Sequence, residues 1–187
     1  DGLRALVGAS SDDTAAGIDA GSARVFVRSG TTWAEEAILT HSGAVAMDGF
    51  GSSVALDATG TRAIVGGQAA DTGAGVNAGT TRVFLRSGSV WSEEATLAPA
   101  APAAQDAFGN TVAVASDASR VIVGAFRDDT TAGADAGSAH VFVRTGTVWA
   151  LESTLEATAR AMGDFFASSV AMSTDGSRVA DVDPDEG

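Results

Sequence analysis

Hydrophobic and polar residues alternate over short stretches along the chain, and glycine-rich turns separate these stretches. Residues 82–86 read Arg-Val-Phe-Leu-Arg, whereas residues 62–66 read Arg-Ala-Ile-Val-Gly and are almost continuously apolar. Alternation is typical of a strand with one buried face, and a short apolar run is typical of a strand buried on both faces. Nothing in the repeated unit shows the period of an amphipathic helix. The pattern predicts an all-β protein.

The same pattern returns at a fixed interval. The stretch at residues 24–33 recurs at 82–91 and at 140–149, and its last residue is a tryptophan at 33, 91 and 149, so the interval is 58 residues. Other residue types keep the same register: Asp48, Asp106 and Asp164; Phe50, Phe108 and Phe166; Arg4, Arg62, Arg120 and Arg178. An interval of this length indicates a repeat architecture.

One repeat reads as four strands joined by turns. Strands are predicted at 53–57, 62–66, 82–86 and 91–97, with tight turns at 58–60 and 87–90 and a polar loop at 68–79. A coil of a β-solenoid needs only about 20 to 30 residues, roughly half of this repeat. Four antiparallel strands with short turns instead predict a blade of a β-propeller.

The register divides the chain into four segments. Residues 1–47 are a partial blade with strands two to four, residues 48–105 and 106–163 are blades, and residues 164–187 are a partial blade with strand one, the start of strand two and an acidic end. About three blades are therefore present, below the roughly four to eight of known propellers. We expect a partial propeller that a second copy or further chain completes, or units that add end to end.

Composition narrows the classes of partner. The formal net charge is −13 and the sequence pI is about 4.2, which excludes a surface that binds a phosphate backbone, so no nucleic-acid partner is expected. Cysteine is absent, which excludes disulfides and thiolate metal sites. There is no apolar run of about 20 residues, so no membrane span is predicted.

The repeated Asp-x-Phe-Gly-x-x-Val-Ala, followed by a strand that ends in Val-Gly-Ala, resembles the FG-GAP repeat. This is the blade motif of integrin α-subunit headpieces and of many bacterial extracellular proteins. The loop at 128–139 and the following Val-Phe-x-Arg-Ser/Thr-Gly-x-x-Trp resemble the bacterial form most. The resemblance implies a seven-bladed propeller, extracellular or at the cell surface, that binds rather than catalyses. Integrin-type calcium loops lie between strands one and two, where Asp57, Asp117 and Asp175 offer one carboxylate each, so that site is not carried over.

Calcium has a different candidate site in the loop between strands two and three. Three pairs six residues apart, flanked by glycines, recur there: Asp13 with Asp19, Asp71 with Asn77, and Asp129 with Asp135. Carboxylates and backbone carbonyls of a flexible loop could hold calcium. Alternatively, these residue types are used because polar loops hydrogen-bond their own backbone. Calcium is the only cofactor that the sequence indicates.

Other recurring polar and aromatic residues have structural interpretations. The tryptophans are expected to pack in the core. Glu35 and Glu36 point to opposite faces of a strand, as do Glu93 and Glu94, which is wrong for a catalytic pair and favours a solvated outer edge. The recurring arginines are expected to pair with nearby aspartates or glutamates. His41 and His140 each occur in one repeat only, and neither suggests a metal or catalytic site.

These observations together favour a non-enzymatic, extracellular or cell-surface module for binding, adhesion or structure. Its expected partners are other protein chains or glycans. One alternative is a carbohydrate-binding or carbohydrate-active propeller whose site lies in blades not present here. A further alternative is a fibre or surface-layer subunit that assembles through open blade ends.

Overall fold

A computed structural model describes residues 2–158 and 161–181. Within these residues the regular structure consists of strands in antiparallel sheets, which confirms the all-β prediction. No helix in this part of the chain has the length and apolar character to cross a membrane. The acidic end predicted from the sequence, residues 182–187, lies outside the described residues.

The sheets follow one another in chain order, and we call them blades 1 to 4. Blade 1 contains β1 (Arg4–Ala9), β2 (Ser22–Ser29) and β3 (Thr32–Leu39); blade 2 contains β4 (Ser53–Leu56), β5 (Arg62–Gly67), β6 (Thr80–Ser87) and β7 (Val90–Leu97); blade 3 contains β8 (Val112–Val114), β9 (Arg120–Ala125), β10 (Ser138–Thr145) and β11 (Val148–Leu155); blade 4 contains β12 (Val170–Met172) and β13 (Val179–Asp181). Each sheet is a simple up-and-down meander, as the blade interpretation predicts.

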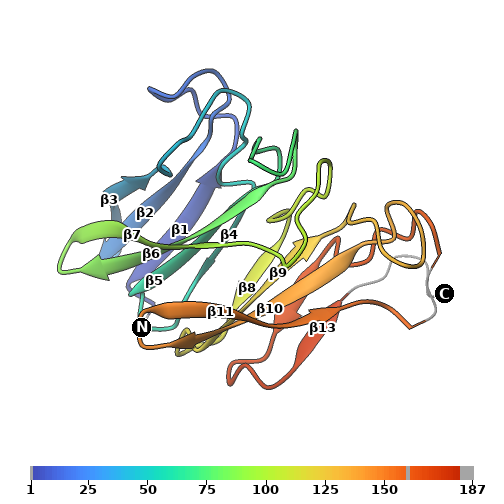
Figure 1. Ribbon diagram of the computed structural model, residues 1–187. Coiled ribbons are helices and arrows are strands. Elements are labelled where there is room, and N and C mark those ends of the chain that lie inside the picture. Colours follow the sequence, from blue (N-terminus) through green and yellow to red (C-terminus); the bar gives the residue numbers. More distant parts are fainter. Residues whose placement is uncertain (1, 159–160, 182–187) are drawn as a thin grey trace.

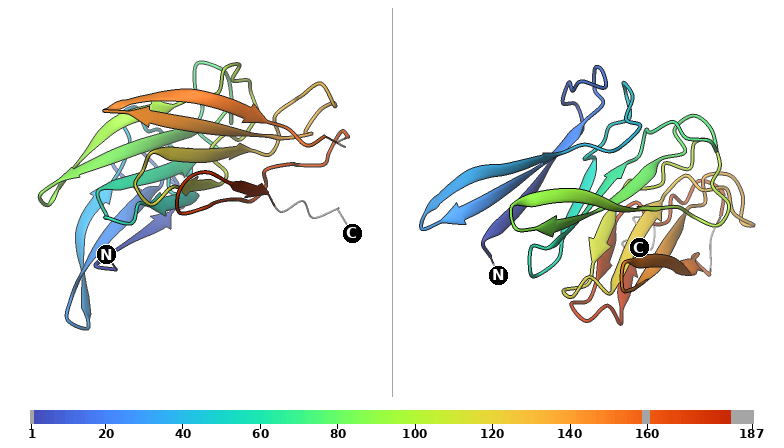
Figure 2. Two further views of the ribbon diagram at one scale, coloured as in Figure 1. Left: turned by 90° about the horizontal axis from the view of Figure 1, so that it is seen from below. Right: turned by 60° about the vertical axis from the view of Figure 1, so that its left-hand side comes forward.

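The blades lie side by side like the ribs of a fan (Figure 1, Figure 2). Their first strands are neighbours, because β4 contacts both β1 and β8, and β8 contacts β12. The two outer strands of each of blades 1 to 3 form a hairpin closed by a two-residue turn that starts with Gly30, Gly88 or Gly146. These glycines have φ between 61° and 66°, the sign that a type II′ hairpin turn needs at its first position.

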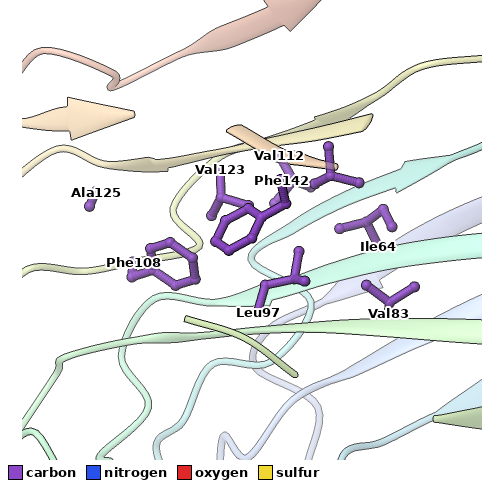
Figure 3. Packing of buried hydrophobic residues seen from close by; sticks show 9 residues of the cluster. Ile64, Val83, Leu97, Phe108, Val112, Val123, Ala125 and Phe142 are labelled. Atoms are coloured by element: carbon purple, nitrogen blue, oxygen red, sulfur yellow. The ribbon is translucent and has the colours of Figure 1, made fainter. Parts of the chain in front are cut away.

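The hydrophobic core lies between the blades. Phe108, which precedes the first strand of blade 3, belongs to one buried cluster with Ile64, Val83 and Leu97 of blade 2 and Phe142 of blade 3 (Figure 3). Phe50 has the same place between blades 1 and 2. The apolar runs 63–65 and 121–123 are almost fully buried, as predicted for strands covered on both faces.

Neighbouring blades also touch through their backbones. A Cβ atom on Gly66 in β5 would lie 2.0 Å from the carbonyl oxygen of Gly109 in the next blade. A Cβ atom on Gly8 would meet the carbonyl oxygen of Gly51 at the same distance. Side chains are therefore excluded from this strand position, and this explains the glycine in the recurring Val-Gly-Ala or Val-Gly-Gly.

We expect Ala167→Gly to stabilise the protein. Ala167 has φ 64°, while the equivalent Gly51 and Gly109 have φ 92° and 91°. A left-handed backbone costs a residue with a Cβ atom about 1 kcal/mol, so the substitution should raise the free energy of unfolding by a comparable amount. Urea unfolding measures the change. Ala171→Gly, in the nearby strand β12, is the control and should be destabilising by about 0.5 to 1 kcal/mol. Equal effects of the two substitutions would contradict the strain at Ala167.

Candidate functional site

The long loops between the second and third strands of the blades lie at one end of the molecule, together with the linkers that connect one blade to the next. The backbone N–H of Met47 in the linker donates to the carbonyl of Ile18 in the loop at 2.9 Å, and Phe50 N–H donates to Ala20 at 3.0 Å. The same bond recurs from Phe108 to the preceding blade's loop. We call this end, formed by loops 10–21, 68–79 and 126–137 and the described linker residues 40–52, 98–111, 156–158 and 161–168, the loop face.

The structure brings the members of each predicted calcium pair together. The Oδ1 atom of the first member accepts a hydrogen bond from the backbone N–H of the second, at 3.0 Å for Asp13 and Asp19, 2.9 Å for Asp71 and Asn77, and 3.0 Å for Asp129 and Asp135. The second members have φ between 51° and 53°, a left-handed conformation that Asp and Asn tolerate better than most residues. The carboxylate of the first member thus holds the turn closed, as the backbone-bonding interpretation expects.

Calcium binding at these loops stays a prediction. Among residues 2–158 and 161–181, no group of three or more His, Cys, Asp or Glu side chains is placed to hold a metal ion. Isothermal titration calorimetry with calcium tests the site directly. Heat of binding that falls in Asp129→Asn would confirm binding at that loop, and an absence of heat in the natural protein together with an unchanged melting temperature on chelation would contradict calcium binding.

A recurring arginine, glutamate and tryptophan connect blade 1 to blade 2 and blade 2 to blade 3. In blade 1, Arg4 Nη2 and Nε donate to the two carboxylate oxygens of Glu36 at 2.7 and 2.9 Å. Trp91 Nε1 of blade 2 donates to the same carboxylate at 3.2 Å. The set recurs one blade later. The bonds from Arg4 hold the pKa of the Glu36 carboxyl below its ordinary range. The expected pairing of the recurring arginines is thus confirmed for Arg4, Arg62 and Arg120, whose partners are glutamates 32 residues later.

The solvated outer edge predicted for the glutamate pairs is wrong for Glu36 and Glu94. Their side chains are only 8% and 4% exposed, because the next blade covers them. The tryptophans are also less buried than the core packing predicted for them. Trp91 and Trp149 are partly buried and hydrogen-bonded, while Trp33 is 47% exposed. In three repeats a glutamate follows the arginine by 32 residues. This constant spacing indicates the ion pair, but the pair was not predicted from the sequence.

Comparison with known proteins agrees with this geometry. The family model described as FG-GAP repeat matches residues 33–84 and 91–142, which together are more than half of the chain. The chain belongs to the FG-GAP repeat family. No curated protein matches the sequence.

The structure explains both halves of the FG-GAP motif in this chain. The Phe-Gly half places a phenylalanine in the core and a backbone turn against the preceding blade, and the Gly-Ala half supplies the glycine that this turn approaches. The aspartate of the motif closes the linker. Asp48 Oδ2 accepts from the backbone N–H of Val45 at 2.8 Å, and Asp106 accepts in the same way from Ala103.

Asp48 and Asp106 are both buried but have different neighbours. His41 Nε2 lies 3.2 Å from Asp48 Oδ2, whereas the position equivalent to His41 is Pro99 in the next FG-GAP repeat. Burial raises the pKa of Asp106 to about 6, and the nearby carboxylates of Asp128 and Asp129 add to the rise.

This raised pKa predicts how Asp106→Asn changes the pH dependence of stability. The ordinary pKa of the carboxyl is 3.8, so between this value and about 6 the folded protein binds more protons than the unfolded chain. The contribution of Asp106 to stability is therefore fully present below pH 4 and is lost as the pH rises through 6. Asparagine keeps the acceptor without a charge. We expect the variant to be more stable than the natural protein at pH 7, with the gain declining towards pH 4.

Urea unfolding of both proteins from pH 4 to pH 7 measures this difference. His140, whose pKa burial lowers to about 4, acts in the opposite direction, since its contribution to stability is lost as the pH falls from 6.5 to 4. Because both proteins contain His140, its effect cancels in the comparison. Stability curves that run parallel over the whole range would contradict the assignment.

Proposed function

We propose that this FG-GAP chain is a non-enzymatic module that acts outside the cell or at its surface in binding, adhesion or structure. FG-GAP repeats are typically binding or structural modules, and the family match supports that class. The recurring arginine, glutamate and tryptophan support a structural role as well, because their hydrogen bonds join successive blades.

The observation that carries the proposal is the composition of the loop face. Ile18, Met47, Val76 and Met162 each expose more than half of their surface there. Ile18 and Met47 lie next to each other, since their backbones are hydrogen-bonded. Exposed apolar side chains with a polar rim mark interaction surfaces, and loops on a rigid scaffold are where binding residues gather. We infer that protein chains or glycans bind to this face.

Substitutions on the loop face test this proposal. The full-length protein is applied to arrays of glycans and of extracellular proteins, and the variants Ile18→Asp and Met47→Asp are compared with Val148→Asp. Val148 is as exposed as these residues but lies in a hairpin at the opposite end. At least a tenfold loss of binding is expected for the first two variants only. Equal losses in all three would contradict the assignment, and binding to a single sugar class would favour the carbohydrate-binding alternative.

The location outside the cell needs a separate measurement. Intact cells are treated with a protease or with antibody against the chain, and lysed cells serve as the comparison. Signal from intact cells is the expected result. Signal that appears only after lysis would contradict an extracellular location.

Self-association is supported by the free edge of β1. In blades 2 and 3 the equivalent strands β5 and β9 pair with β4 and β8, whereas in the described part of the chain this edge of β1 carries no strand. Unpaired edges are templates for further strands. We propose that a second copy or further chain of the same protein adds a strand there. Light scattering of residues 1–187 tests this: a discrete dimer or a ladder of polymers is expected, and a stable monomer would contradict self-association of this segment.

A further inference from the structure

Blade 3 has an open cavity of about 500 Å³ at the loop face. It lies between the linker at 99–101 and the strands β10 and β11. Its walls include the carboxylates of Asp128, Asp129 and Glu156 and the side chains of His140 and Thr154. This volume is in the range of small-molecule pockets and far larger than a single ion requires.

In blade 1 the equivalent place is occupied by an arginine. Arg24 Nη2 donates to Asp12 Oδ2 at 2.9 Å, and Nη1 donates to Glu35 Oε2 at 3.0 Å. Ser22 Oγ donates to the same Asp12 oxygen at 2.7 Å. Asp12 corresponds to Asp128 in the 58-residue register, so the carboxylate that binds a guanidinium in blade 1 has a counterpart in the cavity wall.

Blade 2 has an arginine at the equivalent strand position. This arginine bonds to a glutamate, and the glutamate bonds to the linker. Arg82 Nη1 donates to Glu93 Oε1 at 2.7 Å. The other oxygen of Glu93 accepts from the backbone N–H of Ser42 in the linker at 3.0 Å. Arginine and glutamate together fill the space between the strands and the linker in this blade.

Blade 3 departs from blades 1 and 2 at two strand positions and from blade 2 at a position in the linker. His140 replaces the arginine, Leu151 replaces the glutamate, and Ala100 replaces Ser42. The shorter His140 side chain bonds to its own blade, with Nε2 2.9 Å from Ser138 Oγ and Nδ1 3.2 Å from Thr154 Oγ1. These three changes leave the cavity open.

The acidic side of the site is nevertheless retained. Asp128 accepts a hydrogen bond from Ser138 Oγ, as Asp12 does from Ser22, and its Oδ2 atom lies 4.0 Å from the nearest nitrogen of His140. Burial lowers the pKa of His140 to about 4, so the ring is neutral at pH 7. Burial also raises the pKa of Asp128, and the charges of Glu156 and Asp129 add to the rise. Glu156 is itself particular to this repeat, since Thr40 and Ala98 hold the equivalent positions.

We propose that this cavity binds the guanidinium group of an arginine side chain that a partner chain inserts, in the place of the arginine that blades 1 and 2 supply themselves. The planar fork of a guanidinium fits a carboxylate with two parallel hydrogen bonds, which makes arginine the favoured cation at such sites. The proposal rests on the proposed binding function and gives it a site and a ligand class.

The experiment uses N-acetyl-arginine amide as the probe and the folded chain at pH 7 and low salt. N-acetyl-citrulline amide has the same shape without the charge and is the matched ligand control. Titration calorimetry should show saturable binding of the arginine derivative and at least tenfold weaker binding of the citrulline derivative. An absence of saturable binding, or equal binding of the two, would overturn the proposal.

Three variants locate the site. His140→Arg restores the side chain of blades 1 and 2, so it should abolish binding of the probe and raise the melting temperature. Asp128→Asn should weaken binding at least tenfold, and it keeps the test decisive if the first variant does not fold. Asp12→Asn, at the equivalent position in blade 1, should change binding less than twofold. Unchanged binding in both His140→Arg and Asp128→Asn would place the probe elsewhere and overturn the proposal. Either failure would leave the proposed binding function standing, since the Ile18 and Met47 variants test it separately.

Discussion

Phe108→Ala is expected to lower the free energy of unfolding by about 4 kcal/mol. The Phe108 side chain is 1% exposed and is enclosed by apolar side chains from both blades that it joins. Its ring also makes edge-on contacts with Phe142 and His140, with ring centroids 6.2 and 5.5 Å apart. Alanine would leave a cavity between two sheets, and neither sheet can close it without disturbing the backbone bonds that hold the linker.

Urea unfolding measures this loss, and Phe165→Ala is the matched control. Phe165 is also a phenylalanine next to the FG-GAP motif, but it is 38% exposed, and its ring contact is with Phe126 at 5.9 Å. The control should cost about 1 kcal/mol or less, because water already reaches much of its ring. Losses of similar size in the two variants would show that the interblade position of Phe108 is not what makes it important.

The strands and hairpin turns of the blades were within reach of the sequence because they depend on local pattern and on the repeat. Alternation over residues 82–86 predicted a strand, and the structure has β6 at Thr80–Ser87. Glycine at the predicted turn has the positive φ that the hairpin needs. Each of these features is decided by residues close together in the chain, and three copies in register reinforce the signal.

The burial of Glu36 was beyond such reasoning because it depends on two distant partners. Alternation places Glu35 and Glu36 on opposite faces of β3, but it does not say which face the next blade covers. Arg4 comes from the start of the blade and Trp91 from the outer strand of its neighbour. Only the stacking of blades brings the three groups together.

The members of each predicted calcium pair lie close together in the loops, but the contact between them was not predicted from the sequence. The spacing of Asp13 and Asp19 predicted a shared calcium site, and in the structure the two residues are hydrogen-bonded to each other. It did not reveal that the contact runs from the backbone of Asp19 to the side chain of Asp13. Carboxylate spacing alone does not separate a metal ligand set from a hydrogen-bonded turn, because both bring an oxygen to the same loop.

The cavity of blade 3 depends on departures from the repeat rather than on the repeat itself. His140, Leu151 and Glu156 are visible in the sequence as breaks in register. Their meeting with the linker depends on the hairpin register of β10 and β11 and on the path of the chain between blades. Comparison of blade 3 with blades 1 and 2 therefore shows that blade 3 lacks, at this position, the arginine–carboxylate contact of the other two.

Gly66→Ala is expected to cost about 3 kcal/mol, at the upper end of the effects of overpacking. The new Cβ atom would lie 2.0 Å from the carbonyl oxygen of Gly109 and 2.5 Å from Ser53 Oγ. The serine side chain can rotate away, but the Gly109 carbonyl belongs to the backbone of the next blade. That backbone is held by a 2.9 Å hydrogen bond from the Gly109 N–H to Gly124. The clash is therefore relieved only if blades 2 and 3 separate, which weakens the contacts of Phe108 as well.

Gly73→Ala is the control for Gly66→Ala. Gly73 lies in the exposed loop of the same blade, where no heavy atom would come within 4 Å of a Cβ atom and the backbone does not have a positive φ. Alanine there should change the free energy of unfolding by no more than about 0.5 kcal/mol. Urea unfolding gives the free energy of unfolding of both variants. The comparison separates the effect of replacing any glycine by alanine from the effect of the steric clash at Gly66. A Gly66→Ala protein as stable as its control would mean that the blades can move apart at little cost, and the close backbone approach would then not explain the glycine of the FG-GAP motif.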